Sequence, residues 1–332
     1  MNDIRRIVLW VIFGFSMVLL WDQWQVHNGH RATFFPVGNK PVATAPAAAP
    51  GGATGSAANP ASGVPAPVTS GAAPGASAAA QVPTAAASPA AAPVVREPVV
   101  ITTDLFKLTF DAEGGSLVGA VLLAYPDSVH KDQRFKLLDE SRERVYLAQT
   151  GLISSGGGAA LPTHKTMMKV LPGPRTLEPG EGSLTVRFES PEIGGVKLIK
   201  SFTVKRGSYA IDVRHEVVNT GAAPVAPQLY LQLVRDGNKP PGESSFYSTF
   251  TGPAVYTDAS KYHKVKFEDI EHNKTDIDKQ STGGYVAMVQ HYFASAWVLP
   301  EGVKRDLFVR KVDTNLYAVG MIDPLASIAP GE

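Results

Sequence analysis

The stretch that decides the fold is residues 196–219, which read VKLIKSFTVKRGSYAIDVRHEVVN. Apolar and polar side chains alternate on both sides of a turn at Arg206-Gly207. The inward row is Val196, Leu198, Phe202 and Val204 before the turn, with Lys200 and Ile199 as exceptions, and Tyr209, Ile211, Val213, His215 and Val217 after it. A period of two is the signature of a β-strand with one buried face. The stretch therefore predicts two half-buried strands joined by a turn.

The same alternation extends in both directions along the chain. Phe106, Leu108 and Phe110 share one face of an earlier segment, and alternating leucines continue the pattern at 229–233. Glycine- and proline-rich turn signals separate the runs, and long amphipathic helical patterns are almost absent. Many antiparallel strands without crossover helices indicate a mainly β fold, an enlarged antiparallel β-sandwich over residues 94–332.

One apolar run is open to more than one interpretation. Residues 285–299 read YVAMVQHYFASAWVL and are apolar at both alternating positions. We expect a central strand buried on both faces or a pair of strands, and a helix is the weaker alternative.

A low-complexity segment precedes the β domain. Residues 41–93 contain 22 Ala, 10 Pro and 6 Gly, and no charged or aromatic residue. Such a composition cannot bury enough apolar surface to offset the entropy of ordering. Together with the polar residues that precede it, this segment predicts a disordered linker over residues 25–93.

The N-terminal segment is apolar. Residues 7–21 read IVLWVIFGFSMVLLW and follow Arg5 and Arg6. Fifteen helical residues span roughly 22 Å, against about 30 Å of hydrocarbon in a bilayer. The tryptophans at the end of the run and the lack of a nearby cleavage site favour an uncleaved anchor over residues 4–24, and a cleaved signal peptide or a buried soluble helix are the alternatives. The arginines place the N-terminus in the cytoplasm and residues after about 25 in the periplasm of a bacterium.

Charge and motif content exclude several function classes. The chain has 31 Lys and Arg against 30 Asp and Glu, so no basic excess supports nucleic-acid binding. It has no cysteine, and it has no phosphate-binding glycine loop, serine-nucleophile motif or close histidine pair. We therefore predict no enzyme activity, no cofactor, and no catalytic, cofactor-binding or metal-binding residue.

A few polar residues could have a functional role, but most of them have a simpler structural explanation. His215 and His291 fall within apolar patterns and are predicted to be hydrogen-bonded core histidines. The acidic residues between Glu268 and Asp278 alternate with lysines, which is typical of a solvated loop and lacks the ligand pattern of an EF-hand. Carboxylates available for sugar chemistry, which needs an acid/base pair, are Glu189, Glu192, Glu216 and Glu243.

Several residue runs identify a family resemblance. They are Gly114–Ala120 with Tyr125-Pro126, Phe135–Leu138, Phe202–Gly207 with Tyr209–Ile211, Phe250–Tyr256 with Lys261-Tyr262, and Gly283–Trp297, together with Arg5-Arg6, Leu20-Trp21 and Trp24. Over residues 1–24 and 94–332 the chain resembles the N-terminal portion of the YidC/Oxa/Alb family of bacterial membrane protein insertases. The resemblance implies a galactose-mutarotase-like super-sandwich with an open cleft, in the periplasm and largely dispensable for insertion itself.

The resemblance also implies a role and partners. The expected function is insertion, folding and assembly of inner-membrane proteins, alone or with the Sec translocon, with SecDF, SecYEG, nascent inner-membrane proteins and the lipid bilayer as partners, the last through residues 7–21. A contact with SecF is expected between about Ile211 and Phe267. The helices that carry insertion in the family are not found in the sequence, so we expect a chain that is truncated and a β domain that is incomplete at its C-terminal end. The alternatives are a periplasmic sugar-binding or mutarotase-like β-sandwich and a plain anchored scaffold.

Overall fold

A computed structural model describes residues 98–154, 160–240, 242 and 249–332. The anchor predicted at residues 4–24 and the linker predicted at 25–93 lie outside these residues. Within the part of the chain that is described, no helix is long and apolar enough to cross a membrane.

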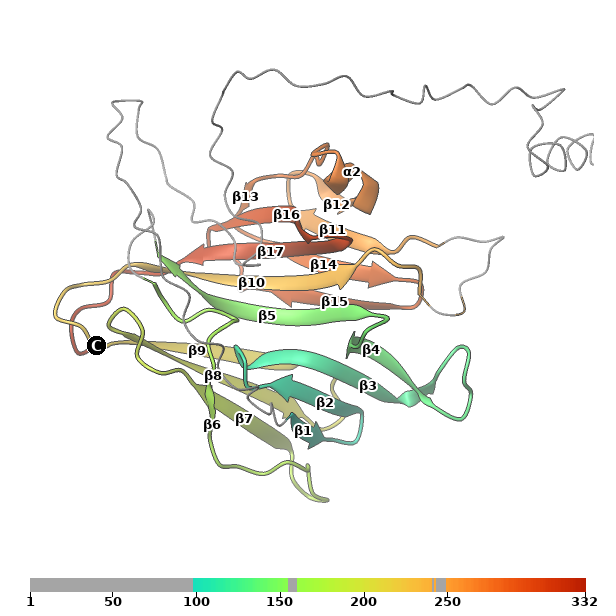
Figure 1. The fold of residues 1–332 in the computed structure, drawn as a ribbon, viewed down its shortest axis with the longest axis horizontal. Coiled ribbons are helices and arrows are strands. Elements are labelled where there is room, and N and C mark those ends of the chain that lie inside the picture. Colours follow the sequence, from blue (N-terminus) through green and yellow to red (C-terminus); the bar gives the residue numbers. More distant parts are fainter. Residues whose placement is uncertain (1–97, 155–159, 241, 243–248) are drawn as a thin grey trace, which may run out of the picture. The chain divides into compact units, whose positions relative to one another are not determined.

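The described residues form a mainly β fold built from antiparallel sheets, as the alternation predicts (Figure 1). The largest sheet has the strand order β1-β2-β3-β4-β5-β10-β17-β16-β13. Its strands are β1 (Val99–Thr102), β2 (Phe106–Asp111), β3 (Ser116–Pro126), β4 (Arg134–Glu140), β5 (Val145–Ser154), β10 (Pro227–Asp236), β17 (Leu316–Pro324), β16 (Arg305–Asp313) and β13 (Gln280–Ser281).

Two smaller sheets of four strands each complete the fold, and both are antiparallel. One has the order β6-β7-β8-β9, with β6 (Lys169–Val170), β7 (Ser183–Glu189), β8 (Val196–Lys205) and β9 (Ile211–Asn219). The other has the order β12-β11-β14-β15, with β12 (Lys261–Lys264), β11 (Gly252–Thr257), β14 (Tyr285–Gln290) and β15 (Phe293–Val298). We call them the β6–β9 sheet and the β11–β15 sheet.

Both smaller sheets pack on the same face of the large sheet. Tyr146 and Thr150 of β5 are four residues apart and therefore point to the same side. The Tyr146 hydroxyl donates to the Met288 carbonyl of β14, and the Thr150 side chain bonds His215 of β9. The result is the enlarged sandwich that the sequence predicts, with one broad layer facing two narrow ones.

The stretch 196–219 forms β8 and β9, paired from Val196↔Asn219 to Val204↔Ile211. The inward side chains of β8 are buried and pack against β2, where the Phe110 ring lies 4.9 Å from that of Phe202. Tyr209 departs from the prediction. It precedes β9, is 44% exposed, and contacts Phe106 edge-on, because the turn is wider than the Arg206-Gly207 signal indicates.

The apolar run 285–299 is the strand pair rather than one central strand. β14 and β15 pair from Tyr285↔Val298 to Gln290↔Phe293. His291, predicted to be a core histidine, is instead an exposed turn residue whose Nδ1 lies 2.8 Å from Thr249 Oγ1. The prediction was wrong because this turn contains no glycine or proline to interrupt the apolar pattern.

The centre of the large sheet is the most deeply buried part of the described chain. Every residue of β10 is buried, on both faces of the sheet, and its neighbours β5 and β17 come from far before and far after it in the sequence. On the face that meets the smaller sheets, apolar residues of β10, β17 and β2 join one hydrophobic core. A second, smaller cluster of Ile153, Tyr230 and Ile322 lies on the opposite face.

Candidate functional site

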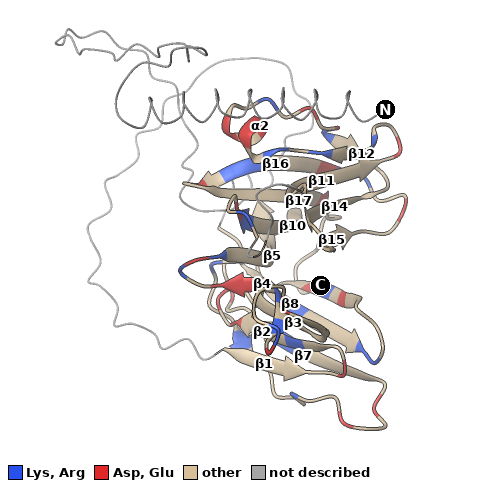
Figure 2. Cartoon of the chain, turned by 90° about the vertical axis from the view of Figure 1, so that its right-hand side faces the viewer, with Lys and Arg blue, Asp and Glu red and all other residues tan. Residues whose placement is uncertain are grey.

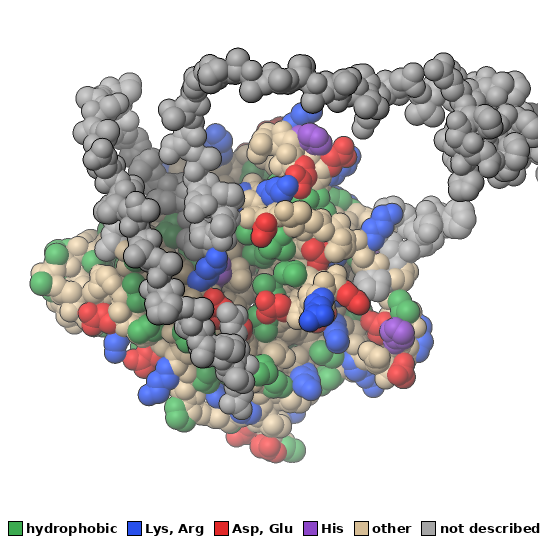
Figure 3. Space-filling view, in the orientation of Figure 1, with side chains coloured by type: hydrophobic (Ala, Val, Ile, Leu, Met, Phe, Trp, Pro, Cys, Tyr) green, Lys and Arg blue, Asp and Glu red, His purple; other side chains and the backbone are tan. Residues whose placement is uncertain are grey.

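A pocket of about 320 Å³ lies where the connection from β3 to β4, the turn from β4 to β5, and the end of β10 meet. Its lining mixes both signs of charge: Asp127, Val129, His130, Gln133, Arg134, Lys136, Asp139, Ser141, Glu143, Arg144, Arg235, Asp236, Asn238, Lys239 and Pro240. Figure 3 shows acidic, basic and histidine side chains together on the side where Figure 1 places the β3–β4 connection.

Two arginines at the base of the pocket share one acceptor on the β11–β15 sheet. Arg235 Nη1 donates to Gln290 Oε1 over 2.5 Å, and Arg144 Nη2 donates to the same oxygen over 3.2 Å. Arg144 also donates to the main-chain carbonyls of Lys136 and Leu137. Burial lowers the pKa of Arg144, and Asp139 and Asp236 partly offset that effect. The two guanidinium groups therefore tie the large sheet to the end of the β14–β15 hairpin.

The buried aromatic ring beneath these arginines completes the cluster. The Arg235 guanidinium lies 5.2 Å from the centre of the Tyr146 ring, within the range of a cation–π contact. Burial raises the pKa of the Tyr146 hydroxyl, which donates to the Met288 carbonyl.

Two of the four carboxylates that line the pocket, Asp127 and Asp236, accept hydrogen bonds from main-chain donors. Asp236 Oδ2 accepts from the Val145 N–H over 2.6 Å, and its Oδ1 accepts from the Asn238 N–H. Asp127 accepts from two N–H groups, and the bond from His130 is the main reason that its pKa is lowered. These bonds fix the turns that line the pocket, and the lowered pKa of Asp127 makes that carboxyl unsuited to general acid–base catalysis, which needs a pKa near the working pH.

A second polar group is buried between the large sheet and the β6–β9 sheet. Lys200, the exception in the alternating pattern of β8, points inward and is 0% exposed. Its Nζ donates to the carbonyls of Gly114 and Thr150, both over 2.6 Å. Burial lowers the pKa of Lys200 to about 7.

His215 belongs to the same group. Its Nε2 lies 2.8 Å from Thr150 Oγ1, and burial, with Lys200 nearby, lowers its pKa to about 3. The prediction of a hydrogen-bonded histidine facing the core is confirmed for His215.

A third polar contact lies on the opposite face of the large sheet. The Tyr230 oxygen accepts from the His164 main-chain N–H over 2.9 Å and lies 2.6 Å from His164 Nδ1. Because burial lowers the pKa of His164 to about 3, its ring is neutral, and the contact with Tyr230 is a hydrogen bond between two uncharged groups. His164 could not be recognised from the sequence as buried, because no local pattern marks its surroundings. Lys200 occupies an inward position in the alternation of β8, but its charge made it an exception to the apolar row.

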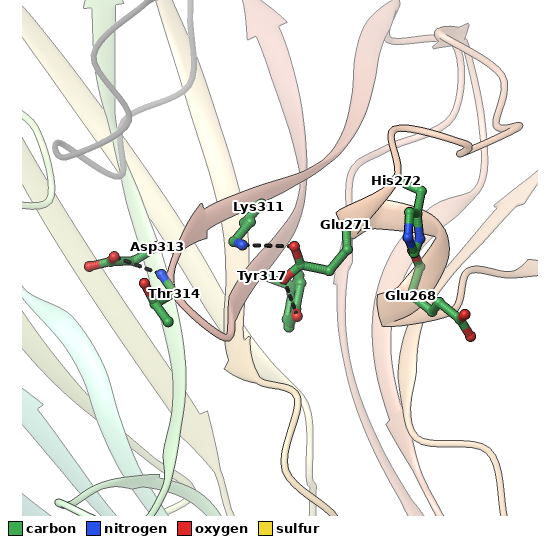
Figure 4. Close-up of polar contacts among 7 residues, drawn as sticks. All are labelled: Glu268, Glu271, His272, Lys311, Asp313, Thr314 and Tyr317. Atoms are coloured by element: carbon green, nitrogen blue, oxygen red, sulfur yellow. Dashed lines mark hydrogen bonds and ion pairs between the residues drawn. The ribbon is translucent and has the colours of Figure 1, made fainter. Parts of the chain in front are cut away.

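The acidic stretch 268–278 is only partly the solvated loop that the sequence predicts. Its start forms a short helix, α2 (Phe267–Glu271), next to β16 and β17. Figure 4 shows Glu271 between Lys311, at 2.7 Å, and the Tyr317 hydroxyl, at 2.7 Å. The hydrogen bond from Lys311 is the main cause of the lowered pKa of Glu271. Asp278, near the other end, accepts a short hydrogen bond from Thr257 Oγ1.

The carboxylates considered for sugar chemistry do not converge on the pocket. Glu189 pairs with Lys197 at 3.2 Å and Glu216 with Arg214 at 3.4 Å, both on the outward rows of the β6–β9 sheet. Glu192 is exposed in the β7–β8 turn, and Glu243 lies outside the described residues. In the described ranges, no group of three or more His, Asp or Glu side chains is arranged to hold a metal ion.

The sheets and the charged pocket define a large antiparallel β-sandwich domain, and comparison with known proteins gives the family. The family model of the YidC periplasmic domain matches residues 98–332. The chain is 47% identical over 329 residues to the membrane protein insertase YidC of Bordetella parapertussis, covering 99% of this chain and 56% of that protein. It is 46% identical over 331 residues to the YidC of a Janthinobacterium species, covering 99% of this chain and 55% of that protein.

The chain belongs to the YidC family of membrane protein insertases, and residues 98–332 form its periplasmic domain. It spans about half the length of the curated relatives that it matches. Among solved structures, a galactose mutarotase related enzyme from Lactobacillus acidophilus covers 71% of this chain and 94% of its own at a TM-score of 0.42 and 12% identity. A likeness at that level carries no functional argument.

The stretch expected to contact SecF is divided by the fold. Residues 211–267 include the edge strands β9 and β12, but also β10, which is buried throughout. Among the described residues of this stretch, the exposed side chains lie on β9, on β12 and in the connections between strands.

Proposed function

We propose that this chain provides the membrane anchor and periplasmic module of a bacterial membrane protein insertase, which acts without catalytic chemistry of its own in the insertion, folding and assembly of inner-membrane proteins. The observation that carries the proposal is the 47% identity to a named insertase over 99% of this chain. An identity of that extent reaches beyond the periplasmic domain into the apolar N-terminal segment.

The proposed topology has residues 7–21 in the inner membrane, the N-terminus in the cytoplasm, and residues after about 25 in the periplasm. The positive charge of Arg5 and Arg6 before the apolar run supports this orientation. Because the chain has no cysteine, a single introduced cysteine reports its own location.

A membrane-impermeant maleimide tests the topology in intact cells with a permeabilised outer membrane. We expect labelling of Ser70→Cys in intact cells and of Asn2→Cys only after lysis of the inner membrane. The reverse pattern, or labelling of both positions in intact cells, contradicts the topology.

We further propose that the module works alone or with the Sec translocon, SecDF and SecYEG, with SecF contacting β9 or β12. The exposed charged residues of these edge strands, Asp212 and Arg214 of β9 and Lys261 and Lys264 of β12, support a polar and reversible contact.

Site-specific photo-crosslinking in cells tests this contact. We expect a photoreactive residue at Asp212 or Tyr262 to capture SecF, and one at the exposed Ser183 of β7, outside the stretch, not to capture it. Capture from Ser183 alone, or from none of the three positions, contradicts the placement while leaving family membership intact.

A further inference from the structure

Among the described residues, the β11–β15 sheet ends in a strand, β15, whose outer edge is unpaired. β15 pairs with β14 on one side only. In an antiparallel ladder every second residue directs its N–H and C=O away from the neighbouring strand. No main-chain hydrogen bond among the described residues runs from the outer edge of β15 to another segment. The edge therefore presents a row of donors and acceptors to any strand that approaches it.

The other outer strands of the described sheets are protected in ways that β15 is not. Edge strands are commonly shielded by charge, short length or coverage, which prevents pairing with other chains. Charge protects β9, through Asp212, Arg214 and Glu216, and β12, through Lys261 and Lys264. β6 and β13 are short, with two residues each. β1 is covered, because Thr102 forms main-chain hydrogen bonds with Arg175 and Leu177. β15 reads FASAWV over six residues, with no charge, proline or glycine. Figure 2 shows this contrast, with basic residues on β12 and none on β15.

The side chains beside the open edge carry no charge on either face of the sheet, and all are apolar except Ser295, which faces inward and hydrogen-bonds Tyr146. Ala294, Ala296 and Val298 point outward and are exposed, Val298 by 67%. On the inner face, Phe293 stacks on Phe135 at 4.3 Å between ring centres, and Trp297 is half-buried against the core. A strand added at this edge would place its side chains next to apolar neighbours on both sides.

The edge is also held in place before any partner arrives. Gln290, opposite the first residue of β15, accepts from Arg235 and Arg144, and the Trp297 indole donates to the Gln232 carbonyl of β10 over 3.1 Å. These contacts fix both ends of β15 to the large sheet. Binding to a preformed edge costs less ordering entropy than binding to a mobile one.

We propose that the outer edge of β15 binds an extended, apolar segment of another polypeptide as a fifth strand of the β11–β15 sheet. The main-chain groups select an extended backbone, as in other cases of strand addition. The absence of charge along β15 and on the side chains beside it selects an uncharged, apolar sequence. The inference goes beyond the proposed function and stands on the geometry of β15 whether or not the chain takes part in insertion.

A peptide-binding assay tests the proposal with the full 332-residue chain in phosphatidylcholine nanodiscs. The probe is a short fluorescein-labelled peptide of alternating valine and alanine with a lysine at each end, and empty nanodiscs give the background anisotropy. The matched control peptide has the same sequence with alternate residues N-methylated, which removes the main-chain donors of one edge and keeps the apolar side chains. We expect saturable binding of the first peptide and none of the second.

A charge placed on the edge tests where the peptide binds. Ala296→Lys adds a charge beside the open edge, and we expect it to weaken binding about tenfold or more, equivalent to about 1.4 kcal/mol. If Ala296→Lys lacks the circular dichroism spectrum of a folded β protein, Ala294→Lys is the second variant to test. Ser183→Lys, on an exposed position of β7, is the control and should bind as the unaltered chain does.

Three results would overturn the inference. Equal binding of the N-methylated peptide would show that side chains alone are recognised. Unchanged affinity in a folded lysine variant of β15 would place the peptide elsewhere. A concentration-dependent dimer in sedimentation velocity that Ala296→Lys abolishes, without peptide binding to the unaltered chain, would make a second copy of this chain the occupant.

Discussion

Replacing the buried Lys200 by methionine should make the stability of the domain respond differently to pH. Methionine fills a similar volume without a charge. Lys200 is 0% exposed, and burial lowers its pKa to about 7 from the ordinary value of 10.5. Below pH 7 the ammonium is charged in both the folded and unfolded states, so the full cost of burying it is present. Between pH 7 and 10.5 the unfolded chain binds more protons than the folded one, so the free energy of unfolding rises with pH.

The size of the effect follows from the two pKa values. A difference of about 3.5 units corresponds to about 5 kcal/mol in total, and about 4 kcal/mol of that falls between pH 6 and pH 10. Against this, Lys200→Met leaves the carbonyls of Gly114 and Thr150 without their donor, at about 1–3 kcal/mol each and at every pH. The difference in unfolding free energy, variant minus unaltered chain, should therefore be more favourable to the variant at pH 6 than at pH 10. This holds whatever the absolute stability of the variant.

Urea unfolding followed by circular dichroism at pH 6, 7, 8, 9 and 10 measures the difference between the two chains. Lys197→Met, on the outward face of β8 and partly exposed, is the control and should show no comparable trend. A difference between Lys200→Met and the unaltered chain that stays constant to within about 1 kcal/mol across this range would refute the reasoning.

Three further outcomes follow from the structure. Burial holds the pKa of His164 and His215 at about 3, so both stay neutral in the folded chain, while the unfolded chain takes up protons below pH 6.5. The unfolding free energy should therefore fall by about 2–3 kcal/mol per histidine between pH 7 and pH 4.5. An unchanged urea midpoint between these pH values would contradict this. Gly320→Ala should destabilise by about 1–3 kcal/mol, because its Cβ would lie within 2.5 Å of the Leu231 carbonyl oxygen, whereas Gly182→Ala meets open space and should be nearly neutral in the same measurement. Arg305 is 0% exposed and donates to five main-chain carbonyls, those of Thr282, Gly284, Leu299, Pro300 and Val303. Arg305→Lys should lower the thermal midpoint by several degrees, since an ammonium cannot reproduce that planar set of donors. A midpoint equal to that of the unaltered chain would show that these five hydrogen bonds are dispensable.

The strands could be predicted from the sequence because their alternation is local. Residues 196–219 yield β8 and β9 with the expected inward row, and even Lys200, which breaks the apolar pattern, keeps its parity and points inward. Where local signals are weak the predictions fail, as for the turn at His291 and for Tyr209, which lies outside the strand it was assigned to.

The order of the strands and the candidate site could not be predicted in this way. At the base of the pocket, Arg144 and Arg235 share Gln290 as a hydrogen-bond acceptor; the three residues are far apart in the chain, and no local pattern encodes their meeting. The same holds for the open edge of β15, because only the arrangement of the sheets shows which apolar strand lacks a neighbour.

The position of β10 between β5 and β17 has a consequence for how the domain is made. A chain delivered from its N-terminus presents β5 long before β10, and β10 long before β17. Until residues 316–324 arrive, the most buried strand of the sheet has a free apolar side, so the domain cannot complete its core by growing from one end. Such long-range closure is slow and leaves intermediates prone to association. During that interval a module that we propose to serve other emerging proteins is itself an incompletely folded chain in need of protection.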